Sequence, residues 1–276
     1  MSQNIVITGC ASGIAKCLAG KLHAQGHHLT LVDINEPGLK AAVADLGIAN
    51  SARVHIEKLD ITDPDAFTEV LSGAVARSGP LDVLLNVAAF LTACYAHEAE
   101  PAAVHRTIDV NVKGVMFGTN AAAKIMVAQG HGHIVNVASL AGVMPVPGIS
   151  LYSASKYAVR GYSLAVAQEL HKHGVAVTVV CPGLVATPMM DMQLHMEEAS
   201  LTFAGRRALE PEEVADSIIA SLKTRPIEVI AAVPFSGEAF MAKLVNSVPS
   251  LAIPITSMVA KMAKRRQAKA KAQAQN

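Results

Sequence analysis

Short apolar runs alternate with longer stretches of helical periodicity along this chain. The runs are rich in β-branched residues and nearly continuous in apolar side chains, as in strands that helices cover on both faces. They lie at residues 5–8, 29–32, 54–56, 83–85, 134–137, 175–180 and 227–230. The helical stretches lie at residues 14–25, 39–46, 64–77, 104–129, 152–172 and 211–223. This alternation predicts parallel crossover units in a single doubly wound α/β domain of about seven parallel strands.

The last part of the chain differs from the rest. No internal boundary appears before about residue 238, so we predict a catalytic domain over residues 1–238 and an extension over 239–276. The segment 187–207 is Met-rich, weakly patterned and follows a strand end, which predicts a mobile lid.

Composition narrows the class of protein. The 276 residues are 51% hydrophobic and 16% charged, which excludes a disordered chain. The chain begins without the basic region of a secretory signal, and its first apolar run is too short for one. The four cysteines are scattered and form no disulfide framework, so we expect reduced thiols in a cytoplasmic protein.

The net charge of +1 hides an asymmetry between body and extension. The last 38 residues hold seven bases and no acid, whereas the preceding 238 hold 16 bases and 22 acids. An acidic body does not suit nucleic acid, so an anionic partner would have to meet the extension. Residues 244–260 are uncharged and interrupted by Pro249 and Pro254, and a basic helix-like stretch follows at 261–271. Two interpretations stay open: peripheral attachment at the inner face of a membrane, or packing on the protein's own cleft or a neighbouring subunit.

The first strand runs into a glycine turn of the kind that binds phosphate. Gly9 and Gly13 allow a sharp turn, and the helix that opens at Gly13 directs its free N–H groups at an anion. The second strand ends at Asp33, about 20 residues further on, where a carboxylate accepts hydrogen bonds from ribose hydroxyls and repels a 2′-phosphate. No Arg or Lys lies within the turn or directly after Asp33. The sequence therefore favours NAD(H) over NADP(H).

A second set of residues suits proton transfer. Tyr152 and Lys156 are four residues apart and share one face of a helix. A neighbouring ammonium is expected to lower the pKa of the tyrosine from about 10, so that it exchanges a proton with an alcohol or ketone. Ser139 follows a strand and is placed to hold the substrate oxygen beside Tyr152.

With these motifs in their order and spacing, residues 3 to about 232 resemble the short-chain dehydrogenase/reductase family. The resemblance implies a Rossmann-type fold and an oxidoreductase. The markers are Thr8-Gly9-x-x-x-Gly13, Asp33, Asp60, Asn86-Val87-Ala88-Ala89, Asn111, Ser139, Tyr152-x-x-x-Lys156 and Pro182-Gly183 with Thr187.

The resemblance also implies a role for each matching residue. Tyr152 would be the general acid/base, Lys156 would bind the nicotinamide ribose and tune Tyr152, Ser139 would orient the substrate oxygen, and Asn111 would hold a water that links Lys156 to solvent. The implied cofactor contacts are Gly9, Ser12, Gly13, Ile14, Asp33, Asp60, Ile61, Asn86, Ala88, Tyr152, Lys156, Pro182, Gly183, Val185 and Thr187. The family also buries the helices at 112–129 and 152–172 between subunits, which implies a homodimer or homotetramer.

Two positions depart from the family pattern. Ala15 stands where the family usually has a third glycine, which serves close packing of helix on strand. The usual Asn-Asn-Ala-Gly is Asn86-Val87-Ala88-Ala89 here, which puts the geometry of that strand end in question.

Together these features predict an NAD(H)-dependent enzyme that interconverts a secondary alcohol and a ketone. Two alternatives remain: a 3-oxoacyl thioester reductase, and a non-catalytic NAD-sensing protein. The eleven histidines show no ligand spacing, so we expect no metal site. The expected substrate is lipophilic (a sterol, retinoid, long-chain or alicyclic compound), because the predicted pocket wall is apolar and Met-rich. That wall comprises Leu140, Ala141, Val143, Met144, Val146, Leu184, Met189 and Met190.

Overall fold

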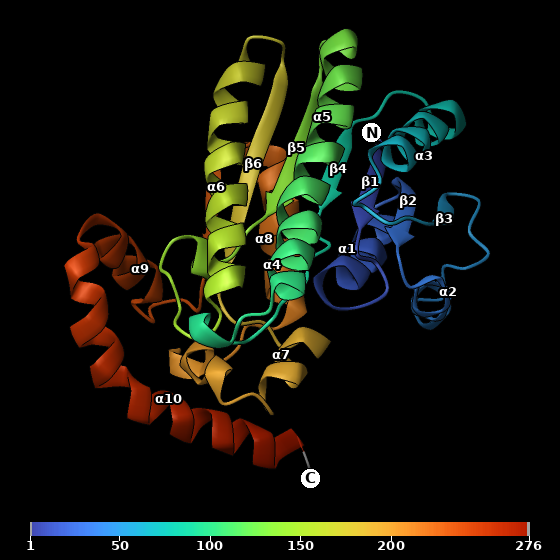
Figure 1. Ribbon diagram of the computed structural model, residues 1–276. Coiled ribbons are helices and arrows are strands. Elements are labelled where there is room, and N and C mark those ends of the chain that lie inside the picture. The colour runs from blue at the N-terminus through green and yellow to red at the C-terminus, as the bar shows by residue number, and fades with distance from the viewer. Residues whose placement is uncertain (1, 275–276) are drawn as a thin grey trace.

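Seven strands form one parallel sheet in the computed structural model, which describes residues 2–274 (Figure 1). Each predicted apolar run forms one strand, and the predicted fold class is confirmed. The strands are β1 Asn4–Thr8, β2 His28–Asp33, β3 Val54–Lys58, β4 Val83–Asn86, β5 Gly132–Val137, β6 Val175–Pro182 and β7 Glu228–Ala231.

Helices cover both faces of this sheet. The predicted stretch 104–129 is helical throughout. A π-helical turn, Asp109–Lys113, joins the α-helices α4 and α5 within it. The α-helices are α1 Gly13–Ala24, α2 Glu36–Asp45, α3 Pro64–Ser78, α4 Pro101–Ile108, α5 Gly114–Gln129, α6 Ser150–His171, α7 Pro188–Gln193, α8 Pro211–Thr224, α9 Glu238–Ser247 and α10 Ala252–Ala274. Short 3-10 helices are η1 Ala96–Glu98, η3 Leu140–Gly142, η4 Glu198–Ala204 and η5 Pro249–Leu251.

The near-continuous apolar strands are explained by this double cover. In β1, Ile5 and Ile7 join a buried cluster with side chains of α1, α2 and α8, whereas Val6 joins a cluster with α3, α5 and α6. Alternate residues of one strand thus enter two different cores, and both must be apolar.

The strand order decides where a ligand can bind. The order is β3-β2-β1-β4-β5-β6-β7, so the chain winds outward in opposite directions from β1 and β4. Open α/β sheets bind ligands outside the carboxyl ends of their strands at such a switch point. The predicted site residues lie at this edge.

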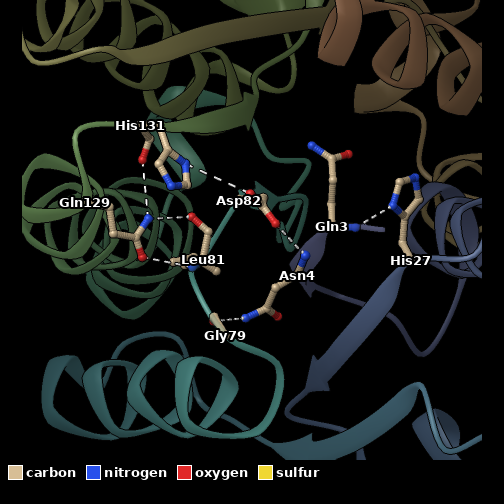
Figure 2. Close-up of polar contacts among 8 residues, drawn as sticks. All are labelled: Gln3, Asn4, His27, Gly79, Leu81, Asp82, Gln129 and His131. Atoms are coloured by element: carbon tan, nitrogen blue, oxygen red, sulfur yellow. Dashed lines mark hydrogen bonds and ion pairs between the residues drawn. The ribbon is translucent and has the colours of Figure 1, made fainter. Parts of the chain in front are cut away.

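The opposite, amino-terminal edge is held by side chains that bond to backbone groups (Figure 2). Asn4 N donates to Asp82 Oδ2 at 2.8 Å, and Asn4 Nδ2 donates to the Gly79 carbonyl at 2.8 Å. The Gln129 amide accepts from Leu81 N at 2.9 Å and donates to the Leu81 carbonyl at 3.0 Å. These bonds fix the starts of β1 and β4 and so support the register at the functional end.

The predicted lid, residues 187–207, forms α7 and η4. Three of its apolar side chains, Leu194, Ala199 and Phe203, are buried. The extension forms α9, η5 and α10, and α10 crosses beneath α7 and η4 in Figure 1. Pro249 begins η5, whereas Pro254 lies in the first turn of α10, where a missing N–H is tolerated. One helix therefore includes Pro254 and the whole basic stretch.

Within the described residues, 2–274, no single helix is long and apolar enough to cross a bilayer. One pair, α9 with the segment Pro249–Ala274, meets the length and composition criteria together, although its two parts are bent by 119°.

Candidate active site

A cavity of about 1250 Å³ opens at the carboxyl ends of the strands. Typical small-molecule pockets measure about 300–1,000 Å³, so this cavity has room for more than one bound molecule. Most of the predicted site residues line it. They are Gly9, Ser12, Gly13, Ile14, Asp33, Asp60, Ile61, Ala88, Ser139, Tyr152, Lys156, Pro182, Gly183, Val185 and Thr187.

The glycine turn is built as the sequence indicates. Gly9 has φ +83°, and a Cβ there would lie 2.9 Å from the Ala88 Cα. Gly13 has φ +57°, in the left-handed region that favours glycine. Ser12 precedes α1 and makes no capping bond with its side chain, so its hydroxyl is free for a ligand. Ala15 is buried within the α1 core, so the domain accommodates the methyl group at this departure from the family pattern.

Asp33 lies at the end of β2, on the cavity wall. Its Oδ2 accepts from Ala11 N and its Oδ1 from Asn35 N, both at 2.9 Å. Each oxygen keeps a lone pair for a ribose hydroxyl. The cap of α2 is Asn35, whose side chain accepts from Gly38 N, so Asp33 does not serve as a helix cap.

The end of β4 is held by hydrogen bonds although its sequence, Asn86-Val87-Ala88-Ala89, departs from the family pattern. Thr8 Oγ1 accepts from Val87 N at 3.0 Å and from Ala88 N at 3.1 Å, which holds this strand end against the glycine turn. Asn86 does not line the cavity. It is buried, and its amide donates to Asn136 Oδ1 at 2.8 Å and to Thr119 Oγ1 at 3.3 Å. Its role here is to brace the strands rather than to contact a ligand.

The residues predicted to transfer a proton line the same cavity. Tyr152 and Lys156 lie on α6, and both side chains are buried. The Lys156 ammonium lies 5.5 Å from the centre of the Tyr152 ring and donates to the Val137 carbonyl at 2.8 Å. Its two other N–H groups remain for a ligand in the cavity. Ser139 Oγ accepts from Ala141 N at 3.1 Å, which fixes that hydroxyl on the wall beside Tyr152.

The expected lowering of the tyrosine pKa is wrong for this structure. Burial raises the pKa of Tyr152 to about 12, and only a hydrogen bond with Ser139 opposes the rise. Burial also lowers the pKa of Lys156 to about 8, and its ammonium is not among the groups that shift the tyrosine. Desolvation therefore outweighs the neighbouring charge. Tyr152 is a neutral phenol at pH 7, the form that donates a proton.

Asn111 is buried behind the cavity wall and does not line the cavity. It is fully buried in the π-helical turn, and its Oδ1 accepts from Phe90 N at 2.7 Å. Its amide donates to the Phe90 carbonyl at 2.7 Å and to Ser155 Oγ at 3.0 Å. The oxygen and the nitrogen of the side-chain amide are both hydrogen-bonded to protein groups. The water that the resemblance implies would therefore have to bind the main-chain carbonyl oxygen of Asn111.

The strand end of β6 supplies the remaining wall. Pro182 ends β6, and Gly183 N donates to the Ala231 carbonyl at 2.8 Å, which ties this end to β7. Beyond it Thr187 Oγ1 donates to the Val185 carbonyl at 3.3 Å. Of the eight predicted apolar wall residues, all but Val143 line the cavity; Val143 is buried in a core cluster instead.

Several wall residues have no signal in the sequence. Ile255, Met258 and Val259 of α10 line the cavity, although they lie about 100 residues beyond Tyr152. Gln193 of α7 also lines it, and its buried Oε1 has no hydrogen-bond partner among the described residues. Arg106 lies on the wall 4.0 Å from the Phe90 ring centre. Only the fold brings these residues to the site.

The histidines form no metal centre in the described residues. Nowhere within residues 2–274 do three or more His, Cys, Asp or Glu side chains lie together as a metal would require.

Comparison with known proteins identifies the family. The family model for short chain dehydrogenases matches residues 3–198. The chain belongs to the short-chain dehydrogenase/reductase family. Among relatives, SadH of Mycobacterium tuberculosis, which is named as an oxidoreductase, is 34% identical over 250 residues, covering 88% of this chain and 90% of SadH.

Solved structures confirm the fold. A short-chain dehydrogenase/reductase from Burkholderia phymatum in complex with NAD superposes with a TM-score of 0.79 at 23% identity, covering 91% of this chain and 95% of that one. ElxO with NADP bound superposes with a TM-score of 0.77 at 24% identity, covering 87% and 100% of the two chains.

The cavity of this chain suits the dinucleotide cofactor that the family implies. A side chain at Gly9 would collide with the backbone of Ala88, so glycine lets the turn pack against the end of β4 and still line the cavity. The buried Lys156 ammonium has one partner, and ribose hydroxyls are acceptors of the kind it lacks. Gly9, Ser12, Gly13 and Ile14 would hold the pyrophosphate, and Asp33 the adenosine ribose.

Proposed function

We propose that this short-chain dehydrogenase/reductase interconverts a secondary alcohol and a ketone with NAD(H), and that its substrate is lipophilic. The observation that carries the proposal is one cavity that joins the proton-transfer residues Tyr152, Lys156 and Ser139 to the glycine turn and Asp33. A bound nicotinamide supplies the hydride acceptor or donor.

In the reductive direction, Tyr152 gives its phenolic proton to the substrate oxygen. Burial keeps that proton on Tyr152 at neutral pH. The ammonium of Lys156 lies on the same helix face, 5.5 Å from the ring, and has two N–H groups left to hold the nicotinamide ribose. Ser139 orients the substrate oxygen, and oxidation reverses these steps.

The preference for NAD(H) is supported by the surroundings of Asp33. The neighbouring wall residues Ala11, Ile34 and Asn35 carry no positive charge for a 2′-phosphate. The Asp33 carboxylate would repel that phosphate and accept bonds from the unmodified ribose.

The lipophilic substrate is supported by the rest of the wall. Apolar side chains from three parts of the chain converge there. They are Leu140, Met144 and Val146 after β5, Leu184, Met189 and Met190 after β6, and Ile255 and Val259 of α10. Such a wall favours an apolar substrate body, and the flexible methionines allow its shape to vary.

The test is the substitution Tyr152→Phe. Because it keeps the ring and removes the acidic proton, turnover of a lipophilic alcohol or ketone should fall by at least about 10²-fold while NADH binding persists. The matched control is Tyr162→Phe, the same change on the same helix, where the hydroxyl donates to Asn120 Oδ1 outside the cavity. Turnover of Tyr152→Phe close to that of the control would remove Tyr152 from the mechanism.

A further inference from the structure

One face of α10 points away from the protein and carries both apolar and basic side chains. Its positions follow helical spacing, so they form one stripe along the helix. We call this set the outer stripe: Pro254, Met258, Lys261, Met262, Arg265 and Lys269, all exposed. Met258 is 74% exposed and Met262 is 40% exposed.

The opposite face of α10 is attached to the body of the protein. Ala263 and Gln267 are buried, and the Gln267 amide donates to the Gln193 carbonyl at 2.9 Å and the Met196 carbonyl at 2.8 Å. The Arg266 guanidinium donates to the carbonyls of Ala204 and Gly205. The helix therefore lies along the surface of α7 and η4 with a fixed rotation about its axis, and the outer stripe must face outward.

The bases of the outer stripe are not used by the protein itself. Lys264, outside the stripe, pairs with Glu197 at 2.7 Å. Lys261, Arg265 and Lys269 take part in no ion pair within residues 2–274. The stretch 239–276 holds no acid that could neutralise them. The stripe therefore presents unpaired positive charge beside exposed apolar side chains.

We propose that the outer stripe docks the protein on an anionic lipid surface, with α10 lying in the plane of the interface. An amphipathic helix with bases and apolar residues facing the same way gains both from headgroup charge and from burial of its apolar side chains. A polyphosphate partner would contact only the basic side chains and would leave Met258 and Met262 in water. Because the opposite face of α10 is committed to the body, the helix lies on the membrane rather than across it.

Docking in this way would bring the cavity close to the lipid. Ile255 and Val259 line the cavity, and Met258 of the outer stripe, 74% exposed, lies at the cavity's rim on the same helix. An apolar compound dissolved in the bilayer would then have a short path to the site. The docking itself does not depend on which reaction the protein catalyses.

The experiment is flotation of the full-length protein with lipid vesicles. One preparation is phosphatidylcholine alone, and the other contains phosphatidylglycerol. We expect recovery with the anionic vesicles, little with the neutral ones, and loss of binding at high salt, since screening at 1 M ionic strength acts within about 3 Å. Equal recovery with both preparations would overturn the proposal.

Substitutions identify the surface that binds. The charge variant is Lys261→Gln with Arg265→Gln and Lys269→Gln. Its partitioning should fall on the order of a hundredfold, because each base near an anionic surface contributes about fivefold. The matched control removes three exposed bases of the body: Lys124→Gln, Lys172→Gln and Lys223→Gln. An equal loss of partitioning in the control variant would show that binding depends only on the overall charge of the protein. It would overturn the proposal that the outer stripe is the binding surface.

An apolar variant tests the other half of the stripe. Met262→Ser should also weaken partitioning, by about tenfold, whereas Ile227→Ser, an exposed position on the body, should not. If the apolar variant instead changes the molar mass in solution and leaves flotation unaltered, the stripe is an interface between protein copies, and the lipid proposal fails. Melting temperature and NADH turnover of every variant establish that the fold is intact.

Discussion

The helix α10 supplies one wall of the cavity, and Gln267→Ala tests how firmly its attachment to the body holds that wall. The side chain of Gln267 is 9% exposed, and its amide donates to two carbonyls, those of Gln193 and Met196. The substitution keeps helix propensity and removes both bonds. Because Ile255, Met258 and Val259 of the same helix line the cavity, loosening α10 should open one wall of the site.

The size of the effect follows from the two lost bonds. A neutral hydrogen bond contributes about 0.5–1.5 kcal/mol, so the two bonds together contribute about 2 kcal/mol to the free energy that keeps α10 attached to the body. Both carbonyls keep a backbone partner, since Gln193 O also accepts from Met196 N and Met196 O from Ala199 N, so no acceptor is left bare. Since about 1.4 kcal/mol is a factor of ten, the fraction of molecules with α10 detached should rise about thirtyfold.

Hydrogen exchange measures this fraction directly. Amides of α10 should lose about thirtyfold protection in Gln267→Ala, while amides of β1 and β4 keep theirs, because local opening leaves the core intact. The matched control is Gln273→Ala, an exposed position on the same helix. KM for bulky apolar substrates should change together with protection. Unchanged protection of α10, or equal loss in β1, would refute the argument that these two bonds hold the wall.

Two further predictions concern the cofactor and the assembly. Asp33→Ala should raise KM for NAD and improve kcat/KM for NADP relative to NAD, since it removes the ribose acceptor and the repulsion of a 2′-phosphate; a wild type that prefers NADP(H) would contradict this. Light scattering should show a homodimer or homotetramer at micromolar concentration, because α5 and α6 carry more apolar side chains than one core face requires, and a monomer would contradict this.

The sequence alone determined the fold and most of the ligand-binding edge. The strand runs and helical stretches need only periodicity, which is local, and all seven strands appear where the pattern placed them. Gly9, Asp33, Tyr152 and Lys156 were found because their chemistry depends on short spacings that the sequence displays. The parallel alternation then brings them to one edge, since all strands of a parallel sheet end on the same side.

The tertiary structure decided the environment of those residues. The pKa of Tyr152 rises rather than falls, because the number of groups that bury a phenol cannot be read from its neighbours in sequence. Asn86 turned out to brace strands through Asn136, a residue 50 positions away.

The extension shows the same limit on a larger scale. Its composition left membrane attachment and packing on the cleft or on a neighbouring subunit both open, because either surface would bury the apolar residues, and only the run of bases favoured the membrane. In the folded protein, one face of α10 contacts the body and the other is exposed to solvent. Gln267 and Arg266 bind the body, Val259 lines the cavity, and Lys261 and Met262 are left to solvent. Which face meets the protein depends on contacts between segments more than 60 residues apart, such as Gln267 with Gln193, and periodicity along a chain carries no information about such contacts.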